Sequence, residues 1–374
     1  MSIKTFHLPI LIFGLTMAIA SCSDDDDDDA VAVEQPTKET AKETKASIEL
    51  EEDVIVLNEG QTAQIEATVT GGGSLEFETG NRKIAIVTDD GLVRAVACGT
   101  TEITVTSGNL EETVTVKVNP VKYDGYTLVW HDEFNGKTLD ESTWNIETGG
   151  NGWGNQEKQY YTDREDNIKV KDGNLIITVR KESYEGNNYT SGRITTKDKQ
   201  DFTFGRIEAR IDLPEGGGTW PAFWMLGYGS WPRCGEIDIM EHVGNRPNMV
   251  SFALHTTNTN GNKGNQWTNQ PTVSGIEDGY HIFGIDWTEK YEVSTGIYRQ
   301  AINFMVDGEV LATQIQGSAT EDMSSWPFYK PFYIILNCAM GGLMGGQIND
   351  NIFNNQDEEP VQMLVDWVRV YQKD

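Results

Sequence analysis

The chain has 374 residues, of which 58 are Asp or Glu and 29 are Lys or Arg, so its formal net charge at pH 7 is -29. Such an excess of negative charge excludes nucleic acid and anionic membrane surfaces as main partners, because both would be repelled at long range. Hydrophobic residues make up 38% of the chain, which is enough for a core and excludes a wholly disordered protein. All 10 Trp and all 13 Tyr lie after residue 122, so the later part of the chain differs chemically from the earlier part.

Residues 1–21 have the features of a secretory signal peptide. Lys4 precedes an apolar run over residues 8–19, which is shorter than the ~20 residues that span a bilayer. Small residues follow, and the string Ile-Ala-Ser-Cys that ends at Cys22 resembles the lipobox of bacterial lipoproteins. This resemblance implies cleavage before Cys22 and lipidation of its sulfur. An ordinary secreted protein with a cysteine near the cleavage site is the alternative.

Residues 22–46 are predicted to form an acidic, flexible tether. Six consecutive aspartates, Asp24 to Asp29, cannot pack against one another and must stay solvated. They resemble the acidic export signals that direct lipoproteins of Bacteroidetes-type bacteria to the outer face of the outer membrane, with a solvated spacer as the alternative. We therefore expect an outer-membrane lipoprotein, exposed at the cell surface, that touches the membrane only through its lipid anchor.

Residues 47–119 are predicted to form a small all-β module. Short alternating apolar runs are separated by glycines, a pattern typical of a sandwich of about seven strands. The segments 86–95 and 99–105 resemble a bacterial Ig-like domain, which implies a spacer. The module contains no Trp or Tyr that could stack on sugars, so a glycan-binding role is the less favoured alternative.

Residues 124–373 continue with strand-like runs, such as those over 175–180, 236–243, 333–338 and 363–370. Amphipathic helices do not alternate with these runs, which argues against a barrel or doubly wound sheet of parallel strands. The pattern favours a large antiparallel sandwich of the jelly-roll kind.

The segment 235–242 places three carboxylates, Glu236, Asp238 and Glu241, among Ile and Met. Strand alternation puts the first two on one face and Glu241 on the other, which would bury it in the core. Burying an unpaired carboxylate is costly, so we predict a β-bulge at residues 239–240 that returns Glu241 to the face of the other two.

With such a bulge, the Cα atoms of Glu236 and Glu241 would lie about 13 Å apart, and the two side chains could bring their carboxyl groups to about 5 Å. Retaining glycoside hydrolysis uses two carboxyl groups about 5 to 5.5 Å apart. Asp238 between them would raise the pKa of at least one carboxyl.

A metal site and a solvated acidic face are the alternatives. A strand spreads oxygens along a line, whereas Ca²⁺ needs them to converge, and a solvated face would not be interleaved with Ile and Met.

The pattern Glu236-x-Asp238-x-x-Glu241 resembles the signature of glycoside hydrolase family 16, in the bulged form of its laminarinases, agarases and carrageenases. The resemblance implies a concanavalin-like β-jelly roll with Glu236 as nucleophile, Asp238 assisting it and Glu241 as general acid/base. Further motifs that resemble this family lie at 128–135, 153–161, 191–194, 205–210, 220–227 and 366–371.

Several residues are expected to contact sugar. Three tryptophans near the catalytic strand are candidates for stacking on pyranose rings, with core packing as the alternative, because Trp is usually largely buried. The resemblance implies hydrogen bonds to sugar hydroxyls from two further positions, and a histidine beside the acid/base is a weaker candidate. The expected substrate-binding residues are Trp220, Trp224, Trp231, Asn155, Arg193 and His255.

The family resemblance also implies one structural Ca²⁺, held by Glu133, the Gly173 carbonyl and Asp366, although these residues could instead form surface ion pairs. Catalysis itself is expected to need no cofactor.

Once Cys22 is set aside, three cysteines remain, an odd number that excludes a complete disulfide framework. A bridge between Cys234 and Cys338 stays open.

The segment 231–241 looks most like endo-1,3-β-glucanases, and the acidic domain disfavours sulfated galactans. We therefore expect a monomeric retaining endo-1,3-β-glucanase that acts on neutral laminarin-type glucan. An agarase-like or mixed-linkage enzyme of the same family is one alternative. A surface lipoprotein that binds glycan without cleaving it is the other, although a pure binder would not need Glu236 and Glu241 at catalytic spacing.

Overall fold

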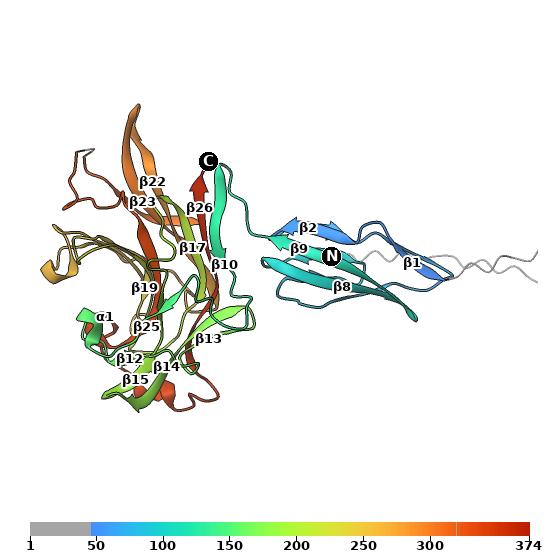
Figure 1. Cartoon of the computed structure of the whole chain (residues 1–374), viewed down its shortest axis with the longest axis horizontal. Helices are drawn as coiled ribbons and strands as arrows, with labels where there is room; N and C mark the ends of the chain where they lie inside the picture. Colours follow the sequence, from blue (N-terminus) through green and yellow to red (C-terminus); the bar gives the residue numbers. More distant parts are fainter. Residues whose placement is uncertain (1–45, 319) are drawn as a thin grey trace, which may run out of the picture. The chain divides into compact units, whose positions relative to one another are not determined.

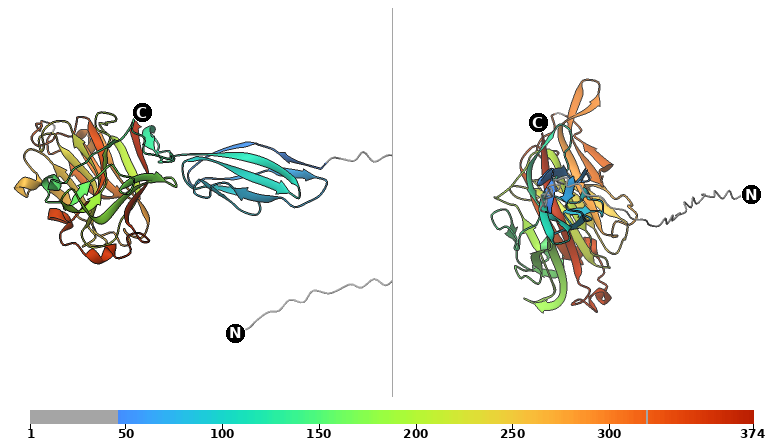
Figure 2. Two further views of the ribbon diagram at one scale, coloured as in Figure 1. Left: turned by 60° about the horizontal axis from the view of Figure 1, so that its bottom comes forward. Right: turned by 90° about the vertical axis from the view of Figure 1, so that its right-hand side faces the viewer.

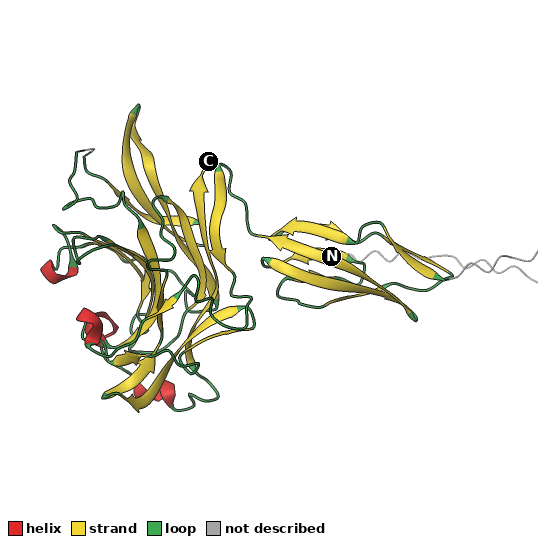
Figure 3. Ribbon diagram, in the orientation of Figure 1, coloured by secondary structure: helices red, strands yellow, loops and turns green. Residues whose placement is uncertain are grey.

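The computed structural model describes residues 46–318 and 320–374. The predicted signal peptide, Cys22 and the tether up to Lys45 lie outside the described residues. Almost all regular structure in the described part is β-strand (Figure 3). Among the described helices, none has the length and hydropathy needed to cross a bilayer.

The first module is built from nine short strands among the described residues, rather than the seven or so expected. A four-stranded sheet has the order β2-β9-β8-β5, a three-stranded sheet the order β3-β7-β6, and β1 pairs with β4. Their inward residues, such as Val93, Ile103 and Val114, form a hydrophobic cluster of their own. The strands are β1 (Ser47–Leu50), β2 (Val54–Asn58), β3 (Thr62–Gln64), β4 (Ala67–Thr70), β5 (Glu76–Thr79), β6 (Ala85–Val87), β7 (Leu92–Ala95), β8 (Gly99–Ser107) and β9 (Leu110–Asn119).

The second module is a sandwich of two sheets, and its larger sheet has ten strands. The main path is β12-β15-β14-β26-β17-β22-β23-β24, with β10 paired to β26 and β13 to β14. The pairing is antiparallel except between β12 and β15, which run parallel. Its strands are β10 (Tyr126–Asp132), β12 (Gln159–Tyr161), β13 (Ile168–Lys171), β14 (Asn174–Tyr184), β15 (Asn187–Ser191), β17 (Gly205–Asp212), β22 (Tyr280–Ser294), β23 (Ile297–Val306), β24 (Glu309–Ile315) and β26 (Val361–Lys373).

The smaller sheet of the sandwich has seven antiparallel strands in the order β11-β16-β25-β18-β19-β20-β21. In Figure 1, β19 and β25 belong to this layer, whereas β17, β26 and β10 belong to the other, and Figure 2 shows the same module from two further sides. Its strands are β11 (Asn145–Ile146), β16 (Arg193–Thr195), β18 (Thr219–Gly227), β19 (Glu236–His242), β20 (Val250–His255), β21 (Trp267–Asn269) and β25 (Phe332–Met340).

The core of the sandwich lies between the two sheets. Phe252 of β20 and Trp267 of β21 stack on Phe304 of β23, with ring centroids 5.2 and 5.1 Å apart, so the two layers meet through aromatic side chains. Alternation along each strand then leaves every second residue of the seven-stranded sheet on its outer face. The predicted jelly-roll sandwich is confirmed.

Short helical turns occur only in loops of the described chain, namely η1 (Gly152–Gly154), η2 (Gly261–Lys263), α1 (Gly342–Gly345) and η3 (Asp350–Phe353). The turn η2 matters below because it follows β20. Its N-cap is Asn260, whose side chain accepts a hydrogen bond from the Lys263 backbone N–H.

Candidate active site

The predicted β-bulge is present in β19. On the side of β18, Phe223 pairs with Met240 and Trp224 with Asp238, which leaves Ile239 without a partner. The pairing with β20 shifts in the same place. Ile239 and Met240 are both buried in the core, as expected where one extra residue interrupts the alternation.

The bulge places the three carboxylates on one face. Glu241 pairs with Ala222, just as Asp238 and Glu236 pair with Trp224 and Leu226. These three partners are alternate residues of β18, which point to the same side of the sheet. That side is the outer one, because Phe223 and Met225 between them lie in the core. Without the bulge, Glu241 would face the core.

The three carboxyl groups have strongly raised pKa values. Burial is the main cause and raises the pKa of each of Glu236, Asp238 and Glu241 to about 8. The charge of Asp238 adds to the effect on both glutamates. The trio therefore retains at least one proton at neutral pH, which is what a general acid requires.

Each glutamate accepts a hydrogen bond from an indole N–H. Trp231 Nε1 lies 3.0 Å from Glu236 Oε2, and Trp220 Nε1 lies 3.1 Å from Glu241 Oε1. Both bonds lower the pKa of the accepting glutamate and so oppose part of the effect of burial. Trp220 is only 8% exposed and packs against Val243, so core packing, the alternative to stacking, describes it better. Trp231 is 37% exposed and retains surface for a ligand.

His255 lies opposite Glu236 in the β19–β20 pair. Its Nε2 is 3.2 Å from Asp238 Oδ2 and 3.5 Å from Glu236 Oε1. Its Nδ1 accepts a hydrogen bond from the backbone N–H of Gly261, at 3.1 Å. The sequence placed this histidine beside the acid/base, whereas in the structure it contacts the other two carboxylates.

Arg193 of β16 lies against two aromatic rings on the seven-stranded sheet. Its guanidinium carbon lies 4.7 Å from the ring centre of Trp153 and 4.9 Å from that of Trp224. Its Nε donates to Glu147 Oε2 at 2.6 Å. The Trp224 indole donates to Asn337 Oδ1 at 2.7 Å, so Arg193 and Trp224 form one rigid pair beside the carboxylates.

Asn155 belongs to a second hydrogen-bond network, which also ends at Asn337. Its amide donates to Glu157 Oε1 at 3.3 Å, and Tyr161 donates its hydroxyl hydrogen to Glu157 Oε2 at 3.1 Å. Asn337 in turn donates to the Tyr161 hydroxyl at 3.1 Å. The predicted sugar-binding residues Asn155, Arg193 and Trp224 are thus brought together.

Sequence reasoning missed Asn337, Glu147 and the role of Trp153. Asn337 had a signal, since it is the one amide in the otherwise apolar run from Phe332 to Met340, a strand buried along its whole length. Glu147 had none, because its contact with Arg193 depends on the pairing of β11 with β16.

The residues predicted to hold calcium, Glu133, Gly173 and Asp366, line one cavity of about 570 Å³. Both oxygens of the Glu133 carboxylate accept hydrogen bonds from Arg369 at 2.8 Å, so this side chain is already committed to a cation. Asp366 accepts from Arg210 through Oδ2 alone, at 2.6 Å. The Gly173 carbonyl and Asp366 therefore suit a calcium ion, whereas the side chain of Glu133 does not.

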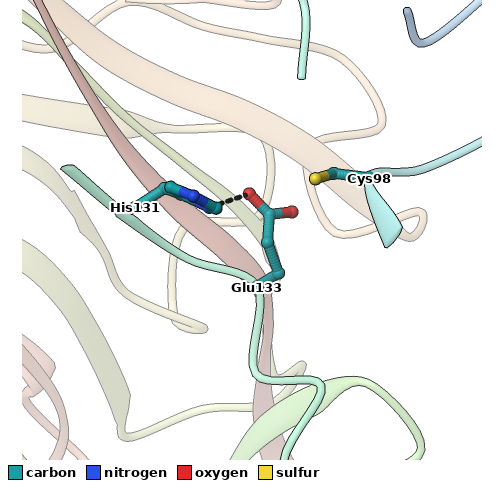
Figure 4. A group of neighbouring side chains, drawn as sticks. All are labelled: Cys98, His131 and Glu133. Atoms are coloured by element: carbon teal, nitrogen blue, oxygen red, sulfur yellow. Dashed lines mark hydrogen bonds and ion pairs between the residues drawn. The ribbon is translucent and has the colours of Figure 1, made fainter. Parts of the chain in front are cut away.

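A second possible ligand group shares Glu133, as Figure 4 shows. Ligand atoms of Cys98, His131 and Glu133 lie within 4.8 Å of one another, and His131 Nδ1 is 3.0 Å from Glu133 Oε1. The guanidinium of Arg369 on the same carboxylate opposes a metal cation here.

The three cysteines of the described residues are free thiols, and Cys234 and Cys338 are both buried without a bridge between them.

Comparisons with known proteins agree with this geometry. Residues 155–369 match the model of glycosyl hydrolases family 16, and residues 45–118 match that of the bacterial Ig-like domain, group 2. A "Beta-glucanase" of Rhodothermus marinus is 42% identical over 259 residues, which cover 66% of this chain and 85% of that protein. A "Glucan endo-1,3-beta-glucosidase" of Cryptopygus antarcticus is 38% identical over 60% of this chain and 84% of its own length.

Solved structures are similar as well. The crystal structure of a laminarinase from Flavobacterium sp. UMI-01 is 44% identical, with a TM-score of 0.57, and the match covers 66% of this chain and all of that one. The fold, the bulged acidic strand and the family match lead to the same conclusion: the chain belongs to glycosyl hydrolase family 16 and carries a bacterial Ig-like domain before its catalytic domain.

Proposed function

We propose that the catalytic domain is a retaining endo-1,3-β-glucanase that cleaves neutral, laminarin-type chains. The observation that carries this proposal is the bulge of β19, which presents two glutamates on one face with Asp238 between them. Relatives named as β-glucanase, glucan endo-1,3-β-glucosidase and laminarinase support the choice of substrate.

The reaction follows from the surroundings of each carboxylate. Glu236 attacks the anomeric carbon, the glycosidic C–O bond breaks, and Glu241 transfers its proton to the leaving oxygen. In the second step Glu241 takes a proton from water, the water oxygen bonds to the anomeric carbon, and Glu236 is released as a carboxylate. Trp231 and His255 both lower the pKa of Glu236 relative to what burial would give, which favours the ionised form that a nucleophile needs.

Product analysis tests this proposal. The wild type and Glu236→Gln would be incubated with laminarin, lichenan, agarose and carrageenan, and the configuration of the first product would be followed by NMR. We expect laminarin to be cut internally with initial release of the β-anomer, and Glu236→Gln to be inactive. Equal turnover by the variant, or initial release of the α-anomer, would contradict the mechanism.

The same experiment separates the alternatives. Faster cleavage of lichenan or agarose than of laminarin would favour the mixed-linkage or agarase-like specificity. Binding without cleavage of any of the four would favour the glycan-binding lipoprotein. Against that role stands the cost of burying three carboxylates together, which binding alone does not require.

For the location of the protein, we propose an outer-membrane lipoprotein exposed at the cell surface. The lipobox-like string ending at Cys22 and the six aspartates after it support this. Labelling with a fatty-acid analogue should mark the wild type but not Cys22→Ala, and external protease should degrade the protein on intact cells. Loss of surface exposure on replacing Asp24 to Asp29 by serine would assign the export signal to the aspartates.

For calcium, we propose that an ion binds at Asp366 and the Gly173 carbonyl, where Ca²⁺ would supply only stability. Oxygen ligands from a carboxylate and a carbonyl are what this ion prefers. Ca²⁺ added after EGTA treatment should raise the unfolding midpoint of the wild type but not that of Asp366→Asn. An equal rise in both would exclude this site.

A further inference from the structure

His255, Glu236 and Asp238 offer ligand atoms within 4.8 Å of one another, a spacing that could hold a metal ion. The hydrogen bonds of the histidine decide against that use. A metal bound through Nε2 needs a lone pair on that nitrogen. The backbone N–H of Gly261 points at Nδ1, and because a backbone N–H can only donate, Nδ1 must be the acceptor. In the neutral ring the proton then resides on Nε2.

The loop that supplies this N–H is held from several directions. Asn260, only 2% exposed, donates to the carbonyl oxygens of Thr256 at 2.9 Å and Thr257 at 3.2 Å. Its own backbone N–H donates to Asn265 Oδ1 at 3.1 Å. Lys263 Nζ also donates to the Thr257 carbonyl oxygen, at 2.8 Å. Gly261 is therefore a fixed donor, and it fixes the tautomer and orientation of the imidazole.

The Nε2–H faces two carboxylates and aligns with neither. The nitrogen Nε2 lies 3.2 Å from Asp238 Oδ2 and 3.5 Å from Glu236 Oε1. Even so, Asp238 Oδ2 is buried without a hydrogen-bond partner of good geometry. The second oxygen of Glu236 already accepts from Trp231. A single N–H is thus positioned between one oxygen of each acid.

We propose that His255 is a positioning residue: the loop 256–266 holds it as the Nε2–H tautomer, so that one fixed N–H serves Glu236 and Asp238 in turn. Before the reaction the N–H supports the ionised nucleophile. When Glu236 becomes an ester it loses its charge, and the same N–H then serves the buried oxygen of Asp238. No proton leaves the imidazole in either step. This inference rests on the proposed glycosidase function.

The first test reads the tautomer without turnover. In ¹⁵N-labelled protein, NMR distinguishes a protonated from an unprotonated ring nitrogen, and the sequence has only five histidines to assign. We expect His255 to show an unprotonated Nδ1 and a protonated Nε2, a signal that is absent from His255→Gln. A protonated Nδ1 would overturn the proposal, whether or not the enzyme proves to be a β-glucanase.

The second test compares the kcat of Gly261→Pro with that of the matched control Gly261→Ala. Proline removes the N–H and puts its Cδ in the place of that hydrogen, so the imidazole also loses its fixed position; the first position of a helical turn and the extended backbone of Asn260 otherwise tolerate proline. Alanine keeps the N–H, and its Cβ would meet His255 no closer than 3.5 Å, which is ordinary contact. We expect kcat to fall about tenfold in the proline variant, with KM nearly unchanged, because without the Gly261 N–H the ring is no longer held with its proton on Nε2, and the N–H that faces the charged oxygen of Glu236 is lost. Equal kcat values in the two variants would overturn the proposal.

The third test uses His255 itself. Glutamine can place an amide N–H near the position of Nε2, whereas leucine cannot. We expect His255→Gln to retain several times the kcat of His255→Leu, with the larger difference in the step that hydrolyses the covalent intermediate. Equal rates in both, with both variants folded, would mean that His255 only fills space.

Discussion

The two sheets of the catalytic domain treat buried carboxylates in opposite ways. On the ten-stranded sheet, Glu208, which is 1% exposed, accepts from Arg206 Nε at 2.7 Å, and Glu133, which directly follows β10, accepts twice from Arg369. On the seven-stranded sheet, Glu236 and Glu241 each accept from an indole N–H and from no arginine among the described residues, and Glu236 also lies 3.5 Å from His255 Nε2. The first arrangement stabilises the charge, whereas the second leaves it costly to form.

The pKa values follow this difference. Burial alone would raise the pKa of Glu133, but the hydrogen bonds from Arg369 and His131 bring it below its usual range. Burial raises the pKa of Glu241 to about 8; the charge of Asp238 adds to this effect, and His255 and the Trp220 indole oppose only part of it. The paired glutamate is ionised at neutral pH and serves structure, while the unpaired one keeps a proton that it can donate.

The largest expected effect is that of Glu236→Gln. We expect activity on β-glucan to fall by about 10³-fold or more, because the nucleophile is lost. The unfolding midpoint should stay equal or rise, since an amide is cheaper to bury than a carboxylate without a cation. Steady-state kinetics and thermal unfolding measure the two effects, with the exposed Glu289→Gln on β22 as control. A fall in both activity and midpoint would mean that Glu236 is a structural residue.

The opposite result is expected on the other sheet. Arg206→Met leaves Glu208 buried without its cation and should cost about 3 to 5 kcal/mol of unfolding free energy. The kcat of the folded variant should stay near that of the wild type. Denaturant titration measures the loss, and the double variant Arg206→Met/Glu208→Gln should recover much of it. A double variant as unstable as the single one would show that packing of Arg206 matters more than charge.

The features of the site differ in whether the sequence alone could predict them. The bulge at Ile239 and Met240 could be predicted, because a local pattern of carboxylates and apolar residues allows only one satisfactory arrangement. The hydrogen bond from Trp220 to Glu241 could not, since it depends on which strands become neighbours. The same holds for Asn337, which joins two networks only because β25 lies between β16 and β18.

The pH dependence of stability should divide between the two sheets. The raised pKa of Glu241 means that its contribution to stability is complete below the ordinary value of 4.5 and is lost as the pH rises toward about 8. The lowered pKa of Glu133 has the reverse sign, so its contribution is present above its ordinary value and is lost as the pH falls through the folded value. Unfolding midpoints between pH 3 and pH 9 should therefore lose part of the alkaline decline in Glu241→Gln and part of the acid decline in Glu133→Gln. Unchanged profiles would refute the division.

The smallest effects are expected from the two indole donors. Trp231→Phe removes the N–H that favours ionised Glu236, so the acid limb of the kcat/KM profile should move to higher pH. Trp220→Phe removes the N–H to Glu241, so the alkaline limb should move up instead. Each change should alter kcat/KM at neutral pH by roughly tenfold or less, the lower range for a hydrogen bond to a charged group. Both variants replace a tryptophan by phenylalanine and remove one indole N–H, each from a different carboxylate. Each variant is therefore the control for the other. If both moved the same limb, the indoles would be tuning the carboxylate trio as a whole, and the assignment of one donor to the nucleophile and one to the acid would have to be abandoned.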